Sequence, residues 1–311
     1  MVWREAAGRR EGPAMTDGSR GHVKRGNSSC AGCGAILILR LITQALGPNE
    51  IVVIPACCMG AVAGQFPNAA FDVPVLRTAF ATTAAFLSGL DASAKVRDQH
   101  TTLVGFAGDG GTVDIGLAAL SGAVERGHDF VYVCYDNEGY MNTGFQRSGS
   151  TPYGARTSTT PGGTLAQYKQ EQRKDIAKIM AAHGIPYLAT ASPAYPDDLK
   201  RKVRRAADVE GPAFLHVMSP CPLGWEFPSS HTICLARLAV ETGLWKLYEL
   251  DHGKVRLTFR PHVRRPVSEY FSGQARFKHF TPEQCEDYQQ SVDREWERIE
   301  KEGFSLSYEA V

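Results

Sequence analysis

The sequence lacks the features that mark several large classes of protein. Its 34 basic and 33 acidic side chains leave almost no net charge, whereas binding nucleic acid without sequence preference requires a clustered basic surface. It has no run of about 18 or more apolar residues, so no transmembrane helix is predicted. Glycine (31) and proline (17) are near average for 311 residues, which argues against a fibrous or broadly disordered chain. We therefore expect a globular protein that binds neither nucleic acid nor a membrane.

The two ends of the chain differ from its middle. Residues 1–22 are charged and glycine-rich and lack the apolar segment of a signal peptide, so we expect a flexible N-terminal segment and a cytoplasmic protein. Residues 282–303 have the pattern of a polar helix, and residues 254–259 alternate like a strand. We expect one main domain over residues 23–250. The extension over residues 251–311 is then either a surface that packs on partner subunits or a solvated terminal segment.

Short apolar runs alternate with alanine-rich helical stretches through the middle of the chain. The runs are almost continuously apolar, which is typical of strands that are buried on both faces of a parallel sheet. They occupy residues 51–54, 102–107, 130–135, 185–190 and 213–218. The expected helices occupy residues 34–47, 77–96, 114–126, 171–183 and 196–208. The pattern predicts an α/β fold with a parallel sheet flanked by helices, which binds its ligands beyond the carboxyl ends of the strands.

Two neighbouring strands are followed by residues that suit a phosphate bound through a cation. Gly108-Asp109-Gly110-Gly111 follows the second predicted strand. Its glycines allow the backbone to approach a ligand, and the start of the next helix favours an anion. Asp109 would repel a bare phosphate, but it suits Mg²⁺, which binds carboxylate or carbonyl oxygens together with phosphate oxygens. Asn137 follows the next strand, 28 residues later, and adjacent parallel strands would place it beside Asp109.

The eight cysteines are too sparse for a disulfide scaffold, and four of them suggest a metal or cluster site. Cys30 and Cys33 form a C-x-x-C motif before a helix. Cys58 and Cys221 each follow a predicted strand, so they fall on the same sheet edge as Asp109. Four thiolates fit either Zn²⁺ or an iron–sulfur cluster, and the residues alone do not separate the two. Structural roles fit the cysteines that have no such pattern, which are Cys134, Cys234 and Cys285.

The residues around Asn137 indicate which protein family the sequence resembles. Gly-Asp-Gly followed after a spacer by Asn is the thiamine-diphosphate motif. The segments that carry a closer resemblance are GDGGTVDIGLAALSGAVERGH, VCYDNEGYMNTG, KIMAAHGIPYLATAS and LAVETGLW. They resemble the β subunits of the multi-subunit pyruvate:ferredoxin oxidoreductases, members of the 2-oxoacid:ferredoxin oxidoreductase family. The resemblance extends over residues 21–280, most of the chain.

The resemblance implies a thiamine-diphosphate-binding fold and a set of cofactor residues. The implied Mg²⁺ ligands are Asp109, the Asn137 side chain and the Gly139 carbonyl, and the residues near the diphosphate are Gly110, Gly111 and Thr143. Asn142 would reach the thiazolium or the substrate as a catalytic residue. Without the resemblance, local loop capping is the simpler role for Asn142 and Thr143. The resemblance also implies a [4Fe–4S] cluster held by Cys30, Cys33, Cys58 and Cys221.

The third cluster ligand has two adjacent candidates, Cys57 and Cys58. The segments Phe66-Pro67 and Val73-Pro74 align with a proline-rich segment of the family, and this alignment places the ligand at Cys58. Cys57 then stands where the family usually has glycine. We therefore expect Cys58 to be the ligand and Cys57 not to be one.

The resemblance implies the oxidative decarboxylation of a 2-oxo acid, with pyruvate and coenzyme A giving acetyl-CoA. Thiamine diphosphate acts as the electron sink, and the [4Fe–4S] cluster accepts the electrons one at a time. The glutamate that activates the cofactor lies on the α subunit in this family. The chain would therefore be active only in a complex with α, γ and ferredoxin-like δ subunits, and it would pass electrons to an external ferredoxin.

Two segments depart from the pyruvate pattern of the family. Residues 57–60 read Cys-Cys-Met-Gly where the family reads Gly-Cys-Leu-Glu, and residues 80–82 read Phe-Ala-Thr where it reads Phe-Glu-Asn. Because two acidic side chains are missing, oxalate or 2-oxoisovalerate could replace pyruvate as the substrate.

The residues also allow a non-redox thiamine-diphosphate decarboxylase with structural zinc, or a non-catalytic scaffold subunit. The sequence leaves open the 2-oxo acid, the direction of reaction, the electron carrier, the subunit stoichiometry and a start at Met15.

Overall fold

The computed structural model describes residues 21–65, 67–160, 162–163, 168–304 and 306. The predicted N-terminal segment over residues 1–22 therefore lies almost entirely outside the described residues. Phe66, one of the residues that favours Cys58 as a ligand, also lies outside them. None of the described helices is long and apolar enough to cross a membrane.

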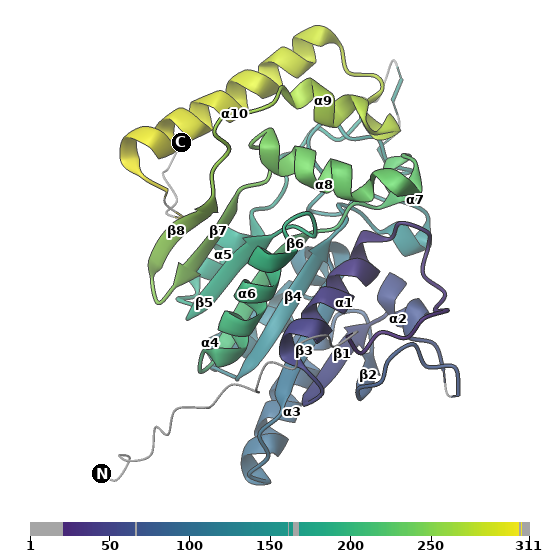
Figure 1. Cartoon of the computed structure of the whole chain (residues 1–311), viewed down its shortest axis with the longest axis vertical. Coiled ribbons are helices and arrows are strands. Elements are labelled where there is room, and N and C mark those ends of the chain that lie inside the picture. Colours follow the sequence, from purple (N-terminus) through teal and green to yellow (C-terminus); the bar gives the residue numbers. More distant parts are fainter. Residues whose placement is uncertain (1–20, 66, 161, 164–167, 305, 307–311) are drawn as a thin grey trace.

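Eight strands form a single sheet, which is the centre of the fold (Figure 1). The strands are β1 (Glu50–Pro55), β2 (Val75–Thr78), β3 (Thr102–Gly108), β4 (Phe130–Asp136), β5 (Tyr187–Ala191), β6 (Pro212–Met218), β7 (Leu247–Asp251) and β8 (Lys254–Phe259). Their order is β2-β1-β3-β4-β6-β5-β7-β8; β7 pairs antiparallel with both β5 and β8, and the other pairs are parallel. The predicted parallel sheet is thus confirmed. The apolar pattern does not predict the short edge strand β2 or the antiparallel strand β7.

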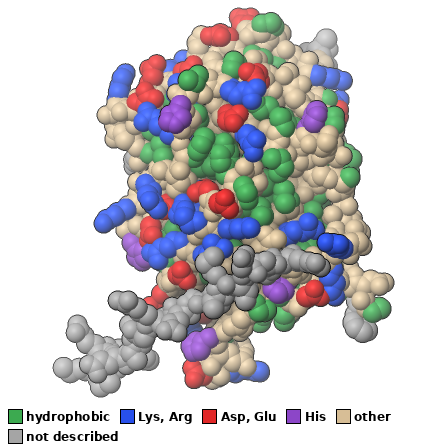
Figure 2. Space-filling model, in the orientation of Figure 1, with side chains coloured by type: hydrophobic (Ala, Val, Ile, Leu, Met, Phe, Trp, Pro, Cys, Tyr) green, Lys and Arg blue, Asp and Glu red, His purple; other side chains and the backbone are tan. Residues whose placement is uncertain are grey.

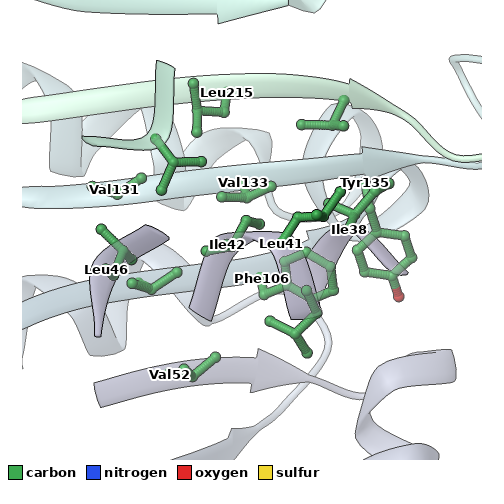
Figure 3. Close-up of a cluster of buried hydrophobic side chains, with 14 of the residues drawn as sticks. Ile38, Leu41, Ile42, Leu46, Val52, Phe106, Val131, Val133, Tyr135 and Leu215 are labelled. Atoms are coloured by element: carbon green, nitrogen blue, oxygen red, sulfur yellow. The ribbon is translucent and has the colours of Figure 1, made fainter. Parts of the chain in front are cut away.

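Helices cover both faces of the sheet. One face is covered by α1 (Gly34–Leu46), α2 (Cys58–Ala63) and α6 (Pro196–Asp208). The other is covered by α3 (Thr83–Val96), α4 (Leu117–Glu125) and α5 (Ile176–Ala182). Figure 3 shows how α1 packs: Ile38 and Ile42 point toward the sheet, against Phe106 of β3 and Val133 of β4. Burying each such side chain stabilises the fold by roughly 1.5–3 kcal/mol of transfer free energy.

Three predicted helices begin later than the sequence suggests. The helix predicted over residues 171–183 begins at Ile176, where the Asp175 side chain caps it, and the other two are displaced by neighbouring structure. The helix predicted over residues 77–96 begins only at Thr83, because residues 75–78 pair with β1 as the edge strand β2. The helix predicted over residues 114–126 begins at Leu117, because Gly110–Asp114 form a single turn of π-helix, η1. In both cases a tertiary constraint at the sheet outweighs the local helix propensity.

The last third of the chain forms a helical layer beyond one end of the sheet (Figure 1). Its helices are α7 (Pro222–Trp225), α8 (Thr232–Glu241), α9 (Val267–Ser272) and α10 (Pro282–Glu302), with the short 3₁₀ turns η3 (Ser229–His231) and η4 (Ala275–Phe277). The apolar side chains of α10 are buried against this layer, for example Trp296. Thr281 and Gln284 form a capping box at the start of α10, which explains where this polar helix begins. The division of the chain at residue 250 stays a prediction, and β8 itself belongs to the central sheet.

Candidate functional site

The carboxyl ends of β3 and β4 bring Asp109 and Asn137 together. The two strands are adjacent and parallel, with Gly108 opposite Tyr135, so the residues that follow them meet at one edge of the sheet. The backbone N–H of Asn137 donates a hydrogen bond to Asp109 Oδ1 over 3.3 Å. The sheet register therefore produces the contact that the spacing of the two residues suggests.

The side chain of Asn137 lies between two other groups that carry oxygen. One terminal atom of its amide is 2.8 Å from the Gly139 carbonyl oxygen and 2.9 Å from Asp109 Oδ1. If this atom is the amide nitrogen, it donates to both oxygens. If it is the amide oxygen, three oxygens face one another, and a cation would satisfy all of them. This donor set of one carboxylate, one amide and one carbonyl is the kind that Mg²⁺ prefers.

The turn that carries these groups is held in a rare backbone conformation. Glu138 has φ 64°, in the left-handed region that few residues other than glycine adopt. Its carboxylate binds Arg173 at 3.0 Å and Arg276 at 2.5 Å, and its carbonyl accepts a hydrogen bond from Thr151 Oγ1 at 2.7 Å. These contacts fix the turn, and the turn directs the Asn137 side chain and the Gly139 carbonyl toward Asp109.

The Asp109 carboxyl group is 1% exposed and lies in an unfavourable place for a lone negative charge. Burial and the nearby charge of Asp136 raise the pKa of Asp109 well above its ordinary value, although a hydrogen bond from the Ser148 hydroxyl lowers it. A bound cation would stabilise the ionised carboxylate and offset the cost of burial. The sequence pattern does not identify Ser148, which approaches from a loop that follows the motif.

Two glycines allow aromatic rings to close over the Asp109 loop. A Cβ atom on Gly110 would lie 2.4 Å from Tyr140 Cε1, and one on Gly111 would lie 3.1 Å from Phe80 Cε2. The Tyr140 ring is held in place because its hydroxyl donates to Asp114 Oδ2 over 2.8 Å. The glycines are therefore needed for the rings of Tyr140 and Phe80 to pack directly on the loop backbone.

The other two residues of the predicted cofactor site, Asn142 and Thr143, occupy the 3₁₀ turn η2 (Met141–Thr143). Asn142 and Thr143 are both exposed. The hydroxyl of Thr143 donates to Gln146 Oε1 over 2.5 Å and to the Tyr140 carbonyl over 3.4 Å. Thr143 therefore has the local capping contacts that its residue type suggests, and the catalytic role of Asn142 stays a prediction.

The segments that carry the four predicted cluster cysteines converge at the same end of the sheet. Cys30 and Cys33 precede α1, Cys58 is the first residue of α2, and Cys221 is the N-cap of α7. The backbone N–H of Gly34 donates to the Pro220 carbonyl over 3.3 Å. These segments lie far apart in the sequence, so the fold itself gathers them.

The thiols of these segments influence one another. Burial raises the pKa of Cys58 to about 12, and the neighbouring thiols of Cys221, Cys57, Cys33 and Cys30 add to the effect. Cys57 has different surroundings. Burial raises its pKa, whereas a hydrogen bond with the Tyr135 hydroxyl and the charge of Arg77 lower it. Cys58 thus shares its surroundings with the other predicted ligands, while Cys57 is directed toward Tyr135.

The described residues contain no ready-made cluster of side chains for a single metal ion. In the described part of the chain, no three His, Cys, Asp or Glu side chains are grouped so that they could hold a metal ion. The remaining cysteines lie apart from this edge or inside the core. Cys134 is fully buried in β4, Cys234 is exposed on α8 and Cys285 lies on α10.

A buried ionic network lies at the end of β4, next to Asn137. The sequence pattern does not predict this network. Asp136 binds Arg173 at 2.6 Å and His216 Nε2 at 2.7 Å. Burial opposes the ionisation of Asp136, but the charges and hydrogen bonds of Arg173 and His216 outweigh it and lower its pKa. The partners of Asp136 lie 37 and 80 residues away along the chain, which explains why no local motif identifies them.

Comparison with known protein families gives one match that covers this edge of the sheet. The family model described as "Thiamine pyrophosphate enzyme, C-terminal TPP binding domain" matches residues 57–217. The matched segment contains the Asp109 loop, the Asn137 turn and the network around Asp136. It begins at the cysteine pair and ends with β6.

Two similar proteins cover nearly the whole chain. The pyruvate synthase subunit PorB of Methanothermobacter marburgensis is 49% identical over 269 residues, which are 86% of this chain and 93% of PorB. The ketoisovalerate oxidoreductase subunit VorB of Pyrococcus furiosus is 47% identical over 289 residues, which are 90% of this chain and 93% of VorB.

The fold also resembles a solved structure. The 2-oxoglutarate:ferredoxin oxidoreductase from Magnetococcus marinus, solved with 2-oxoglutarate, coenzyme A and succinyl-CoA bound, superposes with a TM-score of 0.55. The match covers 70% of this chain and 79% of that chain, with 20% sequence identity. At this identity the likeness establishes a shared fold and nothing about substrates.

Proposed function

The chain belongs to the thiamine pyrophosphate enzyme family and, within it, to the group of pyruvate synthase PorB and ketoisovalerate oxidoreductase VorB subunits, and from this premise we propose that it is the β subunit of a 2-oxoacid:ferredoxin oxidoreductase. The proposed reaction is the oxidative decarboxylation of pyruvate with coenzyme A to give acetyl-CoA. The observation that carries the proposal is that the Asn137 side-chain amide and the Gly139 carbonyl meet beside the Asp109 carboxylate, at the end of two adjacent parallel strands.

The chemistry of this donor set fits Mg²⁺ with thiamine diphosphate. Asp109, the Asn137 side chain and the Gly139 carbonyl would hold Mg²⁺, and Gly110, Gly111 and Thr143 would lie near the diphosphate. When bound, thiamine diphosphate supplies an electron sink for the loss of CO₂ from a 2-oxo acid. The role of Asn142 beside the thiazolium or substrate belongs to the same proposal.

The residues around the loop would prepare the site for that chemistry. The rings of Tyr140 and Phe80 cover one side of the glycine loop, and this wall would exclude water from part of it. Arg173 and Arg276 hold the Glu138 turn, so the Asn137 side chain stays directed at Asp109. Rigid support of this kind reduces the reorganisation that binding and reaction require.

The segments of Cys30, Cys33, Cys58 and Cys221, which converge at one end of the sheet and are called the cysteine edge from here on, would hold the [4Fe–4S] cluster that the family resemblance implies. When bound, the cluster would accept electrons one at a time.

The proposal includes partner subunits. We propose that an α subunit supplies the activating glutamate, and that γ and ferredoxin-like δ subunits complete a complex that delivers electrons to an external ferredoxin. The names of the PorB and VorB relatives, each described as a subunit, support an assembly of several chains. The chain alone would then be inactive.

The relatives favour 2-oxoisovalerate as a substrate almost as strongly as pyruvate. VorB is 47% identical to this chain and PorB 49%, so 2-oxoisovalerate is the alternative to pyruvate. Oxalate is a third candidate, because Ala81 and Gly60 stand where the family pattern has acidic side chains. A steady-state screen of the complex with these three acids separates them. A clear preference for pyruvate contradicts both 2-oxoisovalerate and oxalate.

Metal analysis of the native complex, purified without air, tests the cofactors. The proposal predicts iron, thiamine diphosphate and visible absorption near 400 nm that bleaches on reduction. Zinc without iron would instead indicate a non-redox thiamine-diphosphate decarboxylase with a structural metal. Thiamine diphosphate binding that survives Asp109→Ala and Asn137→Ala unchanged would contradict the proposed site. A complex whose chain binds no cofactor at all would indicate a scaffold subunit.

A further inference from the structure

We propose that the short helix α7 (Pro222–Trp225) couples the cysteine edge to the turn that carries Asn137, beside Asp109. Trp225 is the positioning residue in this proposal. This inference rests on the proposed function, because it assigns the two cofactor sites to these two edges. It goes beyond that function because it states how occupancy of one site changes the other.

The beginning of α7 contacts the cysteine edge. Cys221 is the N-cap of the helix, and the backbone N–H of Gly224 donates to Cys221 Sγ over 3.4 Å. The preceding Pro220 carbonyl accepts a hydrogen bond from the Gly34 N–H, next to Cys33. The beginning of α7 is therefore attached both to a predicted cluster ligand and to the C-x-x-C segment.

The end of α7 contacts the turn that carries Asn137. The indole N–H of Trp225 donates to the backbone carbonyl of Asn137 over 2.8 Å, and the Trp225 side chain is fully buried. The guanidinium of Arg276 lies 3.9 Å from the centre of the Trp225 ring and binds Glu138 at 2.5 Å. Trp225, Asn137, Glu138 and Arg276 thus form a closed ring of contacts, in which Trp225 acts on the Asn137 side chain through its backbone.

A second contact between α7 and the loop is apolar. A Cβ atom on Gly224 would lie 2.1 Å from Met141 Sδ, and a Cβ atom on Gly139 would lie 2.9 Å from Met141 Cε. Met141 therefore fills the space between two glycines, one beside Cys221 and one in the Asn137 turn. Neither glycine can gain a side chain unless Met141 moves, so α7 and the turn are fitted to each other.

These contacts make α7 a short rigid connection between the two sites. If Cys221 is held by a cluster, the hydrogen bond of Trp225 fixes the position of the Asn137 turn. Coupling between two binding equilibria is reciprocal. Loss of the cluster should therefore weaken the binding of Mg²⁺ and thiamine diphosphate, and loss of Trp225 should remove that dependence.

The experiment measures the affinity of the intact complex for thiamine diphosphate in the presence of Mg²⁺, before and after the cluster is removed by oxidation and chelation. In the wild type we expect cluster removal to weaken binding about tenfold, the scale of one lost hydrogen bond. In Trp225→Phe we expect binding to be about tenfold weaker from the start and to change little on cluster removal.

Trp296→Phe is the matched control. Trp296 is also a buried tryptophan, its indole N–H donates to the Gly243 carbonyl over 3.1 Å, and Arg264 lies 5.7 Å from its ring. It lies on α10, so this variant should keep the wild-type dependence on the cluster. Wild-type binding that is indifferent to cluster removal, or a Trp225→Phe complex that keeps the full dependence, overturns the coupling alone. A wild-type complex that contains no iron overturns the proposed function as well.

Discussion

Three oxygen-bearing groups meet at the turn after β4, and Asp109 is the only carboxylate among them. Asp109→Asn keeps the size of this side chain but removes its charge. We expect it to weaken the binding of Mg²⁺ and thiamine diphosphate about 100-fold or more, because a neutral amide replaces the charged ligand. Titration calorimetry on the complex measures the change. Binding within a factor of three of wild type would show that the cation does not bind at Asp109.

The adjacent pair Cys57 and Cys58 allows a comparison within one segment. Cys58 shares its surroundings with Cys33 and Cys221, whereas Cys57 faces Tyr135. We expect Cys58→Ser to lose most of the iron of the complex and Cys57→Ser to retain it. Iron analysis and absorption near 400 nm measure both. The reverse result would assign the ligand to Cys57.

Glu50 gives a prediction about stability that does not depend on any cofactor. Both of its carboxylate oxygens are buried without a hydrogen-bond partner among the described residues, and burial raises its pKa to about 8. The folded state therefore binds this proton more tightly than the unfolded state, so the stabilising effect is complete below about pH 4.5 and declines as the pH rises toward 8.

Glu50→Gln should remove this decline. We expect the free energy of unfolding of the variant to exceed that of the wild type by an amount that grows from pH 5 to pH 8, on the order of 4 kcal/mol at most. Urea denaturation at several pH values measures it. A difference that stays constant with pH would mean that Glu50 is ionised in the folded protein.

At the residue scale, local motifs predict the groups that bind and miss the groups that support them. Asp109 and Asn137 stand out because each follows an apolar strand. Trp225 and Arg276 do not, because they reach Asn137 and Glu138 from 88 and 138 residues away along the chain. Such contacts depend on how the elements pack, and no spacing in the sequence encodes them.

At the scale of elements, η1 (Gly110–Asp114) determines how closely the Tyr140 ring packs on the Asp109 loop. Gly110→Ala would place a methyl group 2.4 Å from the Tyr140 ring. We expect the ring to be displaced and thiamine diphosphate binding to fall at least tenfold, while circular dichroism stays unchanged, because Tyr140 is partly exposed and can move. Gly89→Ala, at a glycine of α3 where an added Cβ would meet no atom within 4 Å, is the control and should bind the cofactor as the wild type does. Equal binding by Gly110→Ala and wild type would show that the position of the Tyr140 ring does not matter for the cofactor.

The central strands were predictable because their apolar residues are nearly continuous, and β1, β3, β4, β5 and β6 follow that pattern. The edge strand β2 was not, because its burial is incomplete and only its pairing with β1 defines it. The π-helical turn η1 was likewise hidden inside a segment of helical composition. The two lie in different places, since β2 is the lateral edge strand and η1 directly follows the carboxyl end of β3.

At the scale of the whole molecule, the sheet edge brings two kinds of chemistry close together. The oxygen-rich turn and the cysteine segments both lie at the carboxyl ends of the parallel strands, and α7 connects them. Basic and acidic side chains are mixed over the face of the molecule in Figure 2, without a field of one sign. This agrees with the near-zero net charge and with partners that are protein subunits rather than a polyanion.

The most direct test of the account is electron paramagnetic resonance of the native complex, purified without air and mixed with pyruvate and coenzyme A in the absence of ferredoxin. The account predicts the signal of a reduced [4Fe–4S] cluster on substrate addition, and its loss when Asp109→Ala is introduced in this chain. A cluster that stays oxidised with every 2-oxo acid, while dithionite reduces it, would contradict the proposal that this chain joins 2-oxo acid chemistry to electron transfer.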